Sequence, residues 1–87
     1  MRVLFVCSRN RLRSPTAAAV FAEVPGWAVD SAGLAPDAEV RIDRELVAWA
    51  EVIVVMEARH RTLLTRQFGD CLRGKRVVCL DIPDRYG

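Results

Sequence analysis

Two apolar segments limit what this chain can fold into. Residues 3–6 and 52–56 are continuous apolar runs of strand length. Uninterrupted apolar strands are typical of a parallel sheet that is buried on both faces, because a strand with one wet face alternates apolar and polar side chains. Neither run approaches the roughly 20 residues that a membrane-spanning helix needs. The sequence therefore predicts a buried parallel sheet and no contact with a membrane.

Helix-forming segments separate the predicted strands. We predict strands at residues 2–6, 27–30, 52–56 and 75–80, and helices at residues 16–23, 44–50 and 59–68. Ser31-Ala32-Gly33 is predicted to be a turn, and Gly69 is predicted to stop the last helix. Strands that alternate with helices indicate an α/β fold, here a three-layer α/β/α arrangement. Ligands of such folds bind beyond the carboxyl ends of the strands.

The length, composition, net charge and cysteine count exclude several classes of function. The 87 residues, 52% of them hydrophobic, are typical of one globular domain, so we expect a single domain over residues 1–87. A net charge of +2 is too small to indicate a nucleic-acid partner. Three cysteines without a CxxC pair predict neither a disulfide scaffold nor a zinc site. Without such a pattern we expect neither a metal nor a cofactor. The N-terminus lacks a signal-peptide pattern, so we expect a cytoplasmic protein.

The segment from Cys7 to Pro15 joins the first predicted strand to the first predicted helix. Ser14 followed by proline is typical of a helix start. A loop at such a junction points backbone N–H groups at one spot, and the helix dipole adds positive charge there, which favours binding of a phosphate. The predicted phosphate cradle comprises Ser8, Arg9, Asn10, Arg11, Leu12, Arg13 and Ser14.

Cys7 is the candidate nucleophile, because it opens this cradle. The arginines at positions 9, 11 and 13 and the helix end favour the ionised sulfur, which can attack phosphorus and form a cysteinyl-phosphate. Arg13 is the candidate phosphate ligand, since its planar guanidinium can hold two phosphoryl oxygens at once. The alternative is an inert cysteine at a strand end, which would not require Arg13-Ser14-Pro15 to follow it.

These residues also resemble a known family. Val3-Leu4-Phe5-Val6-Cys7, followed by Asn10 and Arg13-Ser14-Pro15, is similar to the N-terminal signature of the low-molecular-weight protein tyrosine phosphatases. The similarity continues through Asp30-Ser31-Ala32-Gly33 and into Ile82-Pro83-Asp84-Arg85-Tyr86-Gly87. The fold expected on this basis is a four-stranded parallel sheet of order 2-1-3-4, with the phosphate loop between strand one and helix one.

The resemblance also implies roles for individual residues. Cys7 corresponds to the family's nucleophile and Arg13 to its phosphate-binding arginine, while Asp84 matches the general acid. Ser14 is similar to the serine that stabilises the thiolate, and Tyr86 would form a wall of the cleft. The chain departs from the family where Arg9 replaces a glycine, where Leu12 replaces a second cysteine, and where Arg85 rather than a proline follows the acid.

The predicted function is hydrolysis of phosphomonoesters, with phosphotyrosine as the expected substrate. The partners would be a phosphorylated protein or a small aryl phosphate, with inorganic phosphate or sulfate as ligands. Asp81 is the rival of Asp84 for the general acid, because both lie in the loop after the last predicted strand.

Two other functions stay open at this point. An arsenate reductase of the same fold would need Cys71 and Cys79 to relay a disulfide from Cys7, although Cys79 lies within an apolar strand that favours packing. A non-catalytic module that binds a phosphorylated ligand would keep the cradle and lack a working acid.

His60, flanked by Arg59 and Arg61, is predicted to lie on the solvated face of a helix.

Overall fold

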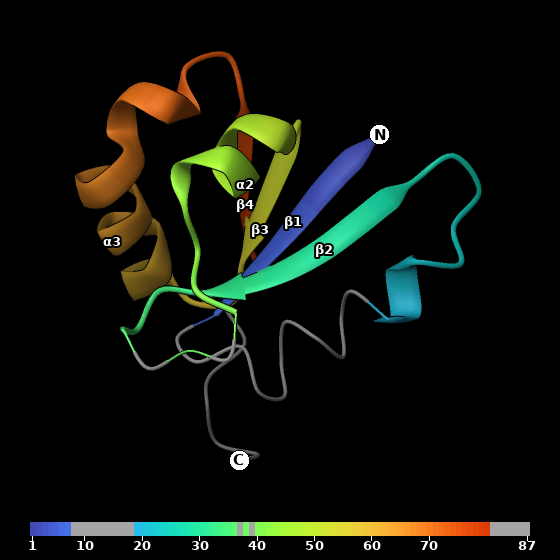
Figure 1. The fold of residues 1–87 in the computed structure, drawn as a ribbon, viewed down its shortest axis with the longest axis horizontal. Coiled ribbons are helices and arrows are strands. Elements are labelled where there is room, and N and C mark those ends of the chain that lie inside the picture. The colour runs from blue at the N-terminus through green and yellow to red at the C-terminus, as the bar shows by residue number, and fades with distance from the viewer. Residues whose placement is uncertain (8–18, 37, 39, 81–87) are drawn as a thin grey trace.

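The computed structural model describes residues 1–7, 19–36, 38 and 40–80. It contains strands β1 (Arg2–Cys7), β2 (Ala28–Gly33), β3 (Val52–Val55) and β4 (Arg76–Cys79). Helix α2 (Arg44–Trp49) precedes β3, and helix α3 (Ala58–Phe68) and the short 3-10 helix η1 (Gly69–Leu72) precede β4. All pairings are parallel, and the sheet has the order β2-β1-β3-β4 (Figure 1). The predicted α/β fold and strand order are confirmed.

Strand β1 lies inside the sheet and is buried on both faces. Leu4 and Val6 belong to one apolar cluster, and Val3, Phe5 and Cys7 belong to another. This division follows from the period of two in a strand, which turns successive side chains to opposite faces. Burial on both faces explains why the sequence of this strand is continuously apolar.

Helices α2 and α3 cover the first of these faces (Figure 1). Val47 of α2 and Leu64 of α3 are fully buried there, against Leu4, Val6 and their neighbours in the sheet. On the opposite face, the ring of Phe21 stacks on Phe5 with a centroid distance of 5.6 Å. The sheet is therefore flanked on both sides, as a layered α/β architecture requires.

Helix α2 begins where the sequence predicts. The Oδ1 atom of Asp43 accepts a hydrogen bond of 2.8 Å from the backbone N–H of Leu46, which satisfies one of the N–H groups that a helix start leaves without an intrahelical partner. The helix then places Val47 on the sheet and ends at Trp49, one residue before the predicted end.

One local prediction is wrong. Ser31-Ala32-Gly33 is not a turn but the second half of β2, because its backbone continues the parallel pairing with Phe5, Val6 and Cys7. The predicted stop at Gly69 is confirmed: α3 ends at Phe68 and Gly69 is its C-cap, with a φ of −50°, before the chain continues into η1. A left-handed turn follows η1 at Gly74, whose φ is +74°.

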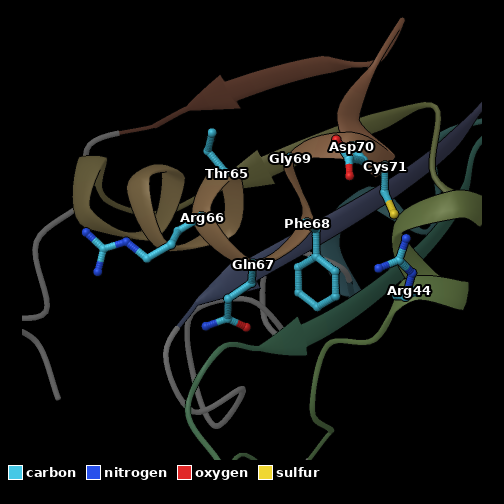
Figure 2. Close-up of a pocket in the computed structure, with 8 residues that line it drawn as sticks. All are labelled: Arg44, Thr65, Arg66, Gln67, Phe68, Gly69, Asp70 and Cys71. Atoms are coloured by element: carbon cyan, nitrogen blue, oxygen red, sulfur yellow. The ribbon is translucent and has the colours of Figure 1, made fainter.

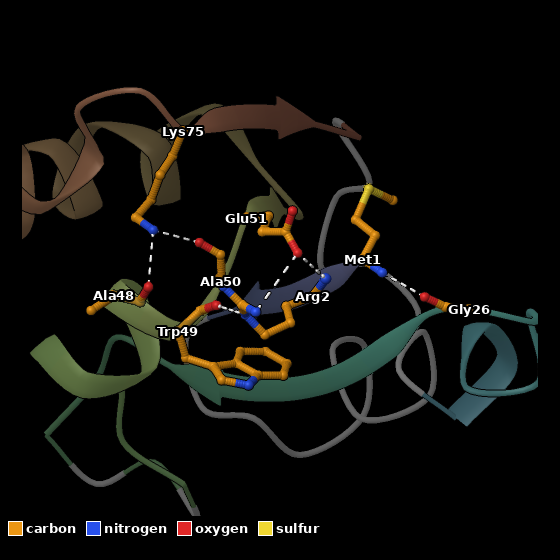
Figure 3. A network of polar contacts seen from close by, with 8 residues as sticks. All are labelled: Met1, Arg2, Gly26, Ala48, Trp49, Ala50, Glu51 and Lys75. Carbon is orange, nitrogen blue, oxygen red and sulfur yellow. Dashed lines mark hydrogen bonds and ion pairs between the residues drawn. The ribbon is translucent and has the colours of Figure 1, made fainter.

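The amino edge of the sheet carries a polar network that caps α2 (Figure 3). The Lys75 ammonium donates to the carbonyl of Ala48 at 3.1 Å and also to that of Ala50. The side chain of Arg2 donates to the carbonyl of Trp49. These carbonyls belong to the last turn of α2 and its C-cap, where an α-helix leaves C=O groups without intrahelical partners and where positive charge is favourable.

No helix in the described part of the chain is long and apolar enough to span a bilayer.

Replacing Lys75 by Met, which keeps the aliphatic stem, removes both hydrogen bonds to the C-terminal turn of α2. We expect the free energy of unfolding to fall by about 1–3 kcal/mol, the range for hydrogen bonds made by a charged donor. Denaturant unfolding followed by circular dichroism measures the change. Arg73→Met, at an exposed position in the same turn, is the matched control, and an equal loss in both variants would contradict the capping role of Lys75.

Candidate active site

Cys7 is the last residue of β1 and lies at the carboxyl edge of the sheet, between the ends of β2 and β3. It is only 3% exposed and belongs to the apolar cluster of Phe5, Val54 and Met56. Its carbonyl oxygen accepts a hydrogen bond of 2.9 Å from the backbone N–H of Leu34. The predicted nucleophile is therefore held by the sheet itself, at the edge where ligands of parallel α/β folds bind.

On the β2 side, a segment that follows β2 forms backbone hydrogen bonds with the end of that strand. Gly33, the register partner of Cys7, donates its N–H to the carbonyl of Val40 at 2.7 Å, and its own carbonyl accepts from Ile42 at 2.9 Å. These bonds form a parallel bridge between Gly33 and Arg41. Gly33 pairs with Cys7, and both its N–H and its carbonyl group are hydrogen-bonded. The backbone of Cys7 therefore has little freedom to shift.

On the β3 side, the junction with α3 completes the edge. The N–H of Met56 donates to the carbonyl of Val6 at 3.2 Å, so the β1–β3 ladder extends to the residue before Cys7. Glu57 is the N-cap of α3, and its backbone N–H donates to the Nδ1 atom of His60 at 3.1 Å. The carboxylate of Glu57 accepts from the guanidinium of Arg59.

His60 is fully buried, with 0% of its surface exposed. The prediction that it lies on a solvated helix face is wrong. The arginines on either side of it are exposed, but His60 shares the inward face of α3 with Leu64, one helical turn later. The pair at spacing i, i+4 was the signal in the sequence that could have placed it inside.

Several predicted site residues lie outside the described residues. They are the cradle residues Ser8, Arg9, Asn10, Arg11, Leu12, Arg13 and Ser14, and the C-terminal residues Asp81, Asp84 and Tyr86. Of the predicted catalytic residues, the structure places Cys7 alone, and the roles of Arg13 and Asp84 stay predictions.

The other two cysteines lie apart from Cys7, and none of the three, all of which the structure describes, forms a disulfide. Cys79 ends β4 and packs in the cluster on the opposite face of the sheet from Cys7, with β3 between their strands. Cys71 lies in η1, shortly before the amino end of β4. Because a six-residue strand spans roughly 16 Å, Cys71 is remote from the carboxyl end of β1.

A pocket of about 210 Å³ opens beside Cys71, between α2, the end of α3 and η1 (Figure 2). Its lining comprises Arg44, Thr65, Arg66, Gln67, Phe68, Gly69, Asp70 and Cys71. Cys7, the predicted catalytic residue that the structure describes, is not among the described lining residues. Among the described residues, no group of His, Cys, Asp and Glu side chains is arranged to hold a metal ion.

Solved structures share this fold. The YwlE arginine phosphatase from Geobacillus stearothermophilus is 25% identical to the chain with a TM-score of 0.82, and the alignment covers 99% of this chain and 76% of that one. A YwlE mutant from Bacillus subtilis is 25% identical with a TM-score of 0.78, covering 92% of this chain and 71% of that one. A low molecular weight protein tyrosine phosphatase from Bacillus subtilis is 24% identical with a TM-score of 0.78, and the alignment covers 92% of this chain and 70% of that one. No protein-family model and no curated protein sequence matches the chain.

The separation of the cysteines predicts that mild oxidation forms no intramolecular disulfide with Cys7. A disulfide requires Cα atoms within about 7 Å. Cys79 lies two strand spacings from Cys7, about 9–10 Å, and on the other face of the sheet. Peptide mapping by mass spectrometry after oxidation of the monomer measures the outcome. A linked Cys7–Cys71 or Cys7–Cys79 pair would contradict the arrangement of the sheet.

Proposed function

The chain is like the low-molecular-weight protein tyrosine phosphatases in its fold, and we propose that it is a phosphatase that hydrolyses phosphomonoesters through Cys7. The observation that carries the proposal is the place of this cysteine: a buried thiol at the carboxyl end of the strand between β2 and β3, followed in sequence by five residues, an arginine and a serine. The similarity to an arginine phosphatase over 99% of the chain supports it.

In the proposed reaction, the sulfur of Cys7 attacks phosphorus while the bond from phosphorus to the leaving oxygen breaks. Asp84 donates its proton to that oxygen, and Arg13 holds two of the phosphoryl oxygens as negative charge spreads over them. Asp84 then removes a proton from water, which attacks phosphorus and breaks the P–S bond. Phosphate leaves, and the thiolate and the protonated carboxyl group are restored.

The arrangement of the cysteines favours a phosphatase over the redox alternative. An arsenate reductase would need Cys71 or Cys79 to approach Cys7, but Cys71 lies toward the amino edge of the sheet and Cys79 on the opposite face. The alternative of a non-catalytic binding module differs from the proposal only in lacking turnover, so an activity measurement separates the two.

Two substrate classes have support. The sequence resemblance favours phosphotyrosine, in which an oxygen leaves phosphorus. The similarity to an arginine phosphatase instead favours phosphoarginine, a phosphoramidate rather than a phosphomonoester, in which a guanidino nitrogen leaves phosphorus. Both reactions use the same nucleophile and need a proton donor for the leaving group, so the described residues fit either.

Cys7→Ser is expected to abolish turnover while binding of inorganic phosphate is retained, because the hydroxyl is a far weaker nucleophile than the thiolate and has nearly the same size. Hydrolysis of an aryl phosphate and of a phosphoarginine peptide measures activity, and the ratio of the two kcat/KM values in the unmutated protein decides between the substrate classes. Cys71→Ser is the control and should keep full activity. Wild-type turnover in the Cys7→Ser variant would end the proposal.

Asp84→Asn is expected to lower kcat about 10²–10⁴-fold, the range for loss of a general acid or base. The pH profile of kcat measured on an aryl phosphate should also lose the limb that reports this carboxyl group. Asp81→Asn is the matched control within the same segment. An unchanged kcat for Asp84→Asn with a loss for Asp81→Asn would transfer the acid role to Asp81.

A further inference from the structure

The junction between β3 and α3 contains a buried imidazole that the proposed reaction does not use. His60 is the only histidine of the chain, and none of its surface is exposed. Burial of a histidine requires that its polar atoms find partners, since an unsatisfied polar group in the interior costs free energy. The bond from the backbone N–H of Glu57 to Nδ1, at 3.1 Å, provides one such partner.

This bond specifies the tautomer of the neutral ring. An imidazole nitrogen that accepts a hydrogen bond carries no proton, so in the neutral ring the proton lies on Nε2. A doubly protonated ring would turn Nδ1 into a donor that faces the donor N–H of Glu57. The arrangement therefore requires the neutral Nε2–H tautomer.

The bond also connects α3 to the end of β1. Glu57 is the N-cap of α3 and directly follows Met56, whose N–H donates to the carbonyl of Val6, the residue before Cys7. The backbone of His60 in turn donates to the carbonyl of Glu57 at 3.0 Å, so the side chain and the backbone of His60 hold both polar backbone groups of the cap residue. Met56 is 1% exposed and lies in the same apolar cluster as Cys7.

We propose that His60 is a positioning residue for Cys7: by holding the backbone of Glu57, its Nδ1 atom fixes the β3–α3 junction against the end of β1, where the nucleophile lies. The proposal rests on the phosphatase function for its kinetic consequences, but its geometry is independent of that function. Cys7 would then be held from both sides, by the hydrogen bonds of Gly33 on the β2 side and by the His60–Glu57 bond on the β3 side.

Nitrogen-15 NMR tests the geometric part directly, because a single histidine gives an unambiguous imidazole spectrum. At neutral pH we expect the Nε2-protonated neutral ring in the unmutated protein. A ring protonated on Nδ1, or on both nitrogens, would overturn the proposal whether or not the protein hydrolyses any phosphate.

Two variants test the positioning role. Gln, the usual residue at this place in a capping box, can accept from the N–H of Glu57, whereas Leu fills space and accepts nothing. We expect His60→Leu to lower kcat by about 10-fold or more with little change in KM, since small misplacements of a reacting group are costly, and His60→Gln to restore most of that loss. The amide signals of Leu34 and Met56, which report the hydrogen bonds around Cys7, should shift in His60→Leu and return in His60→Gln.

Val47→Ala is the control for stability alone, because it removes buried volume from α2, away from the junction. It should keep the wild-type kcat at temperatures where it is folded. Equal kcat in His60→Leu and the unmutated protein, or equal losses in the Leu and Gln variants, would overturn the positioning role. If the unmutated protein shows no turnover, but the amide signals still shift in His60→Leu and return in His60→Gln, the proposed function is wrong and the positioning role still holds.

Discussion

The parallel pairing of β1 with strands on both sides is the constraint on which the rest of the structure depends. Because β1 is buried on both faces and bonded along both edges, its last residue can neither rotate away nor slide in register without breaking pairs with β2 and β3. Cys7 is that last residue. A nucleophile gains most when the protein holds it in its reactive geometry beforehand, and a central strand supplies much of that rigidity to whatever residue ends it.

The two edges of the sheet are built differently. At the amino edge, charged side chains satisfy backbone carbonyls, as Arg2 and Lys75 do for the last turn of α2. At the carboxyl edge, backbone groups bond to each other, Gly33 with Val40 and Ile42 and Met56 with Val6, and the imidazole of His60 accepts from the N–H of Glu57. The predicted cradle, which follows Cys7 in the sequence, contains three arginines, at positions 9, 11 and 13.

Much of this was predictable from the sequence, and the failures have physical reasons. Apolar runs predicted the strands, and the position of Cys7 after the first run predicted that this candidate nucleophile lies at the carboxyl edge. Ser31-Ala32-Gly33 was mistaken for a turn because small residues have weak strand preference, and only the pairing with β1 makes them a strand. His60 was assigned to solvent from its charged neighbours, although a helix turns adjacent residues to different faces. The cradle residues and Asp84 lie outside the described residues, so their predicted roles depend on sequence alone.

The placement of the cysteines also limits how a covalent intermediate at Cys7 can be resolved. All three cysteines are described, and neither Cys71 nor Cys79 lies where a second thiol could attack the first. A phosphate bound to sulfur would therefore have to leave by attack of water. Water at neutral pH is a poor nucleophile unless a base removes its proton. In the proposed reaction one carboxyl group would supply both needs, first as the acid that protonates the leaving group and then as the base that activates water.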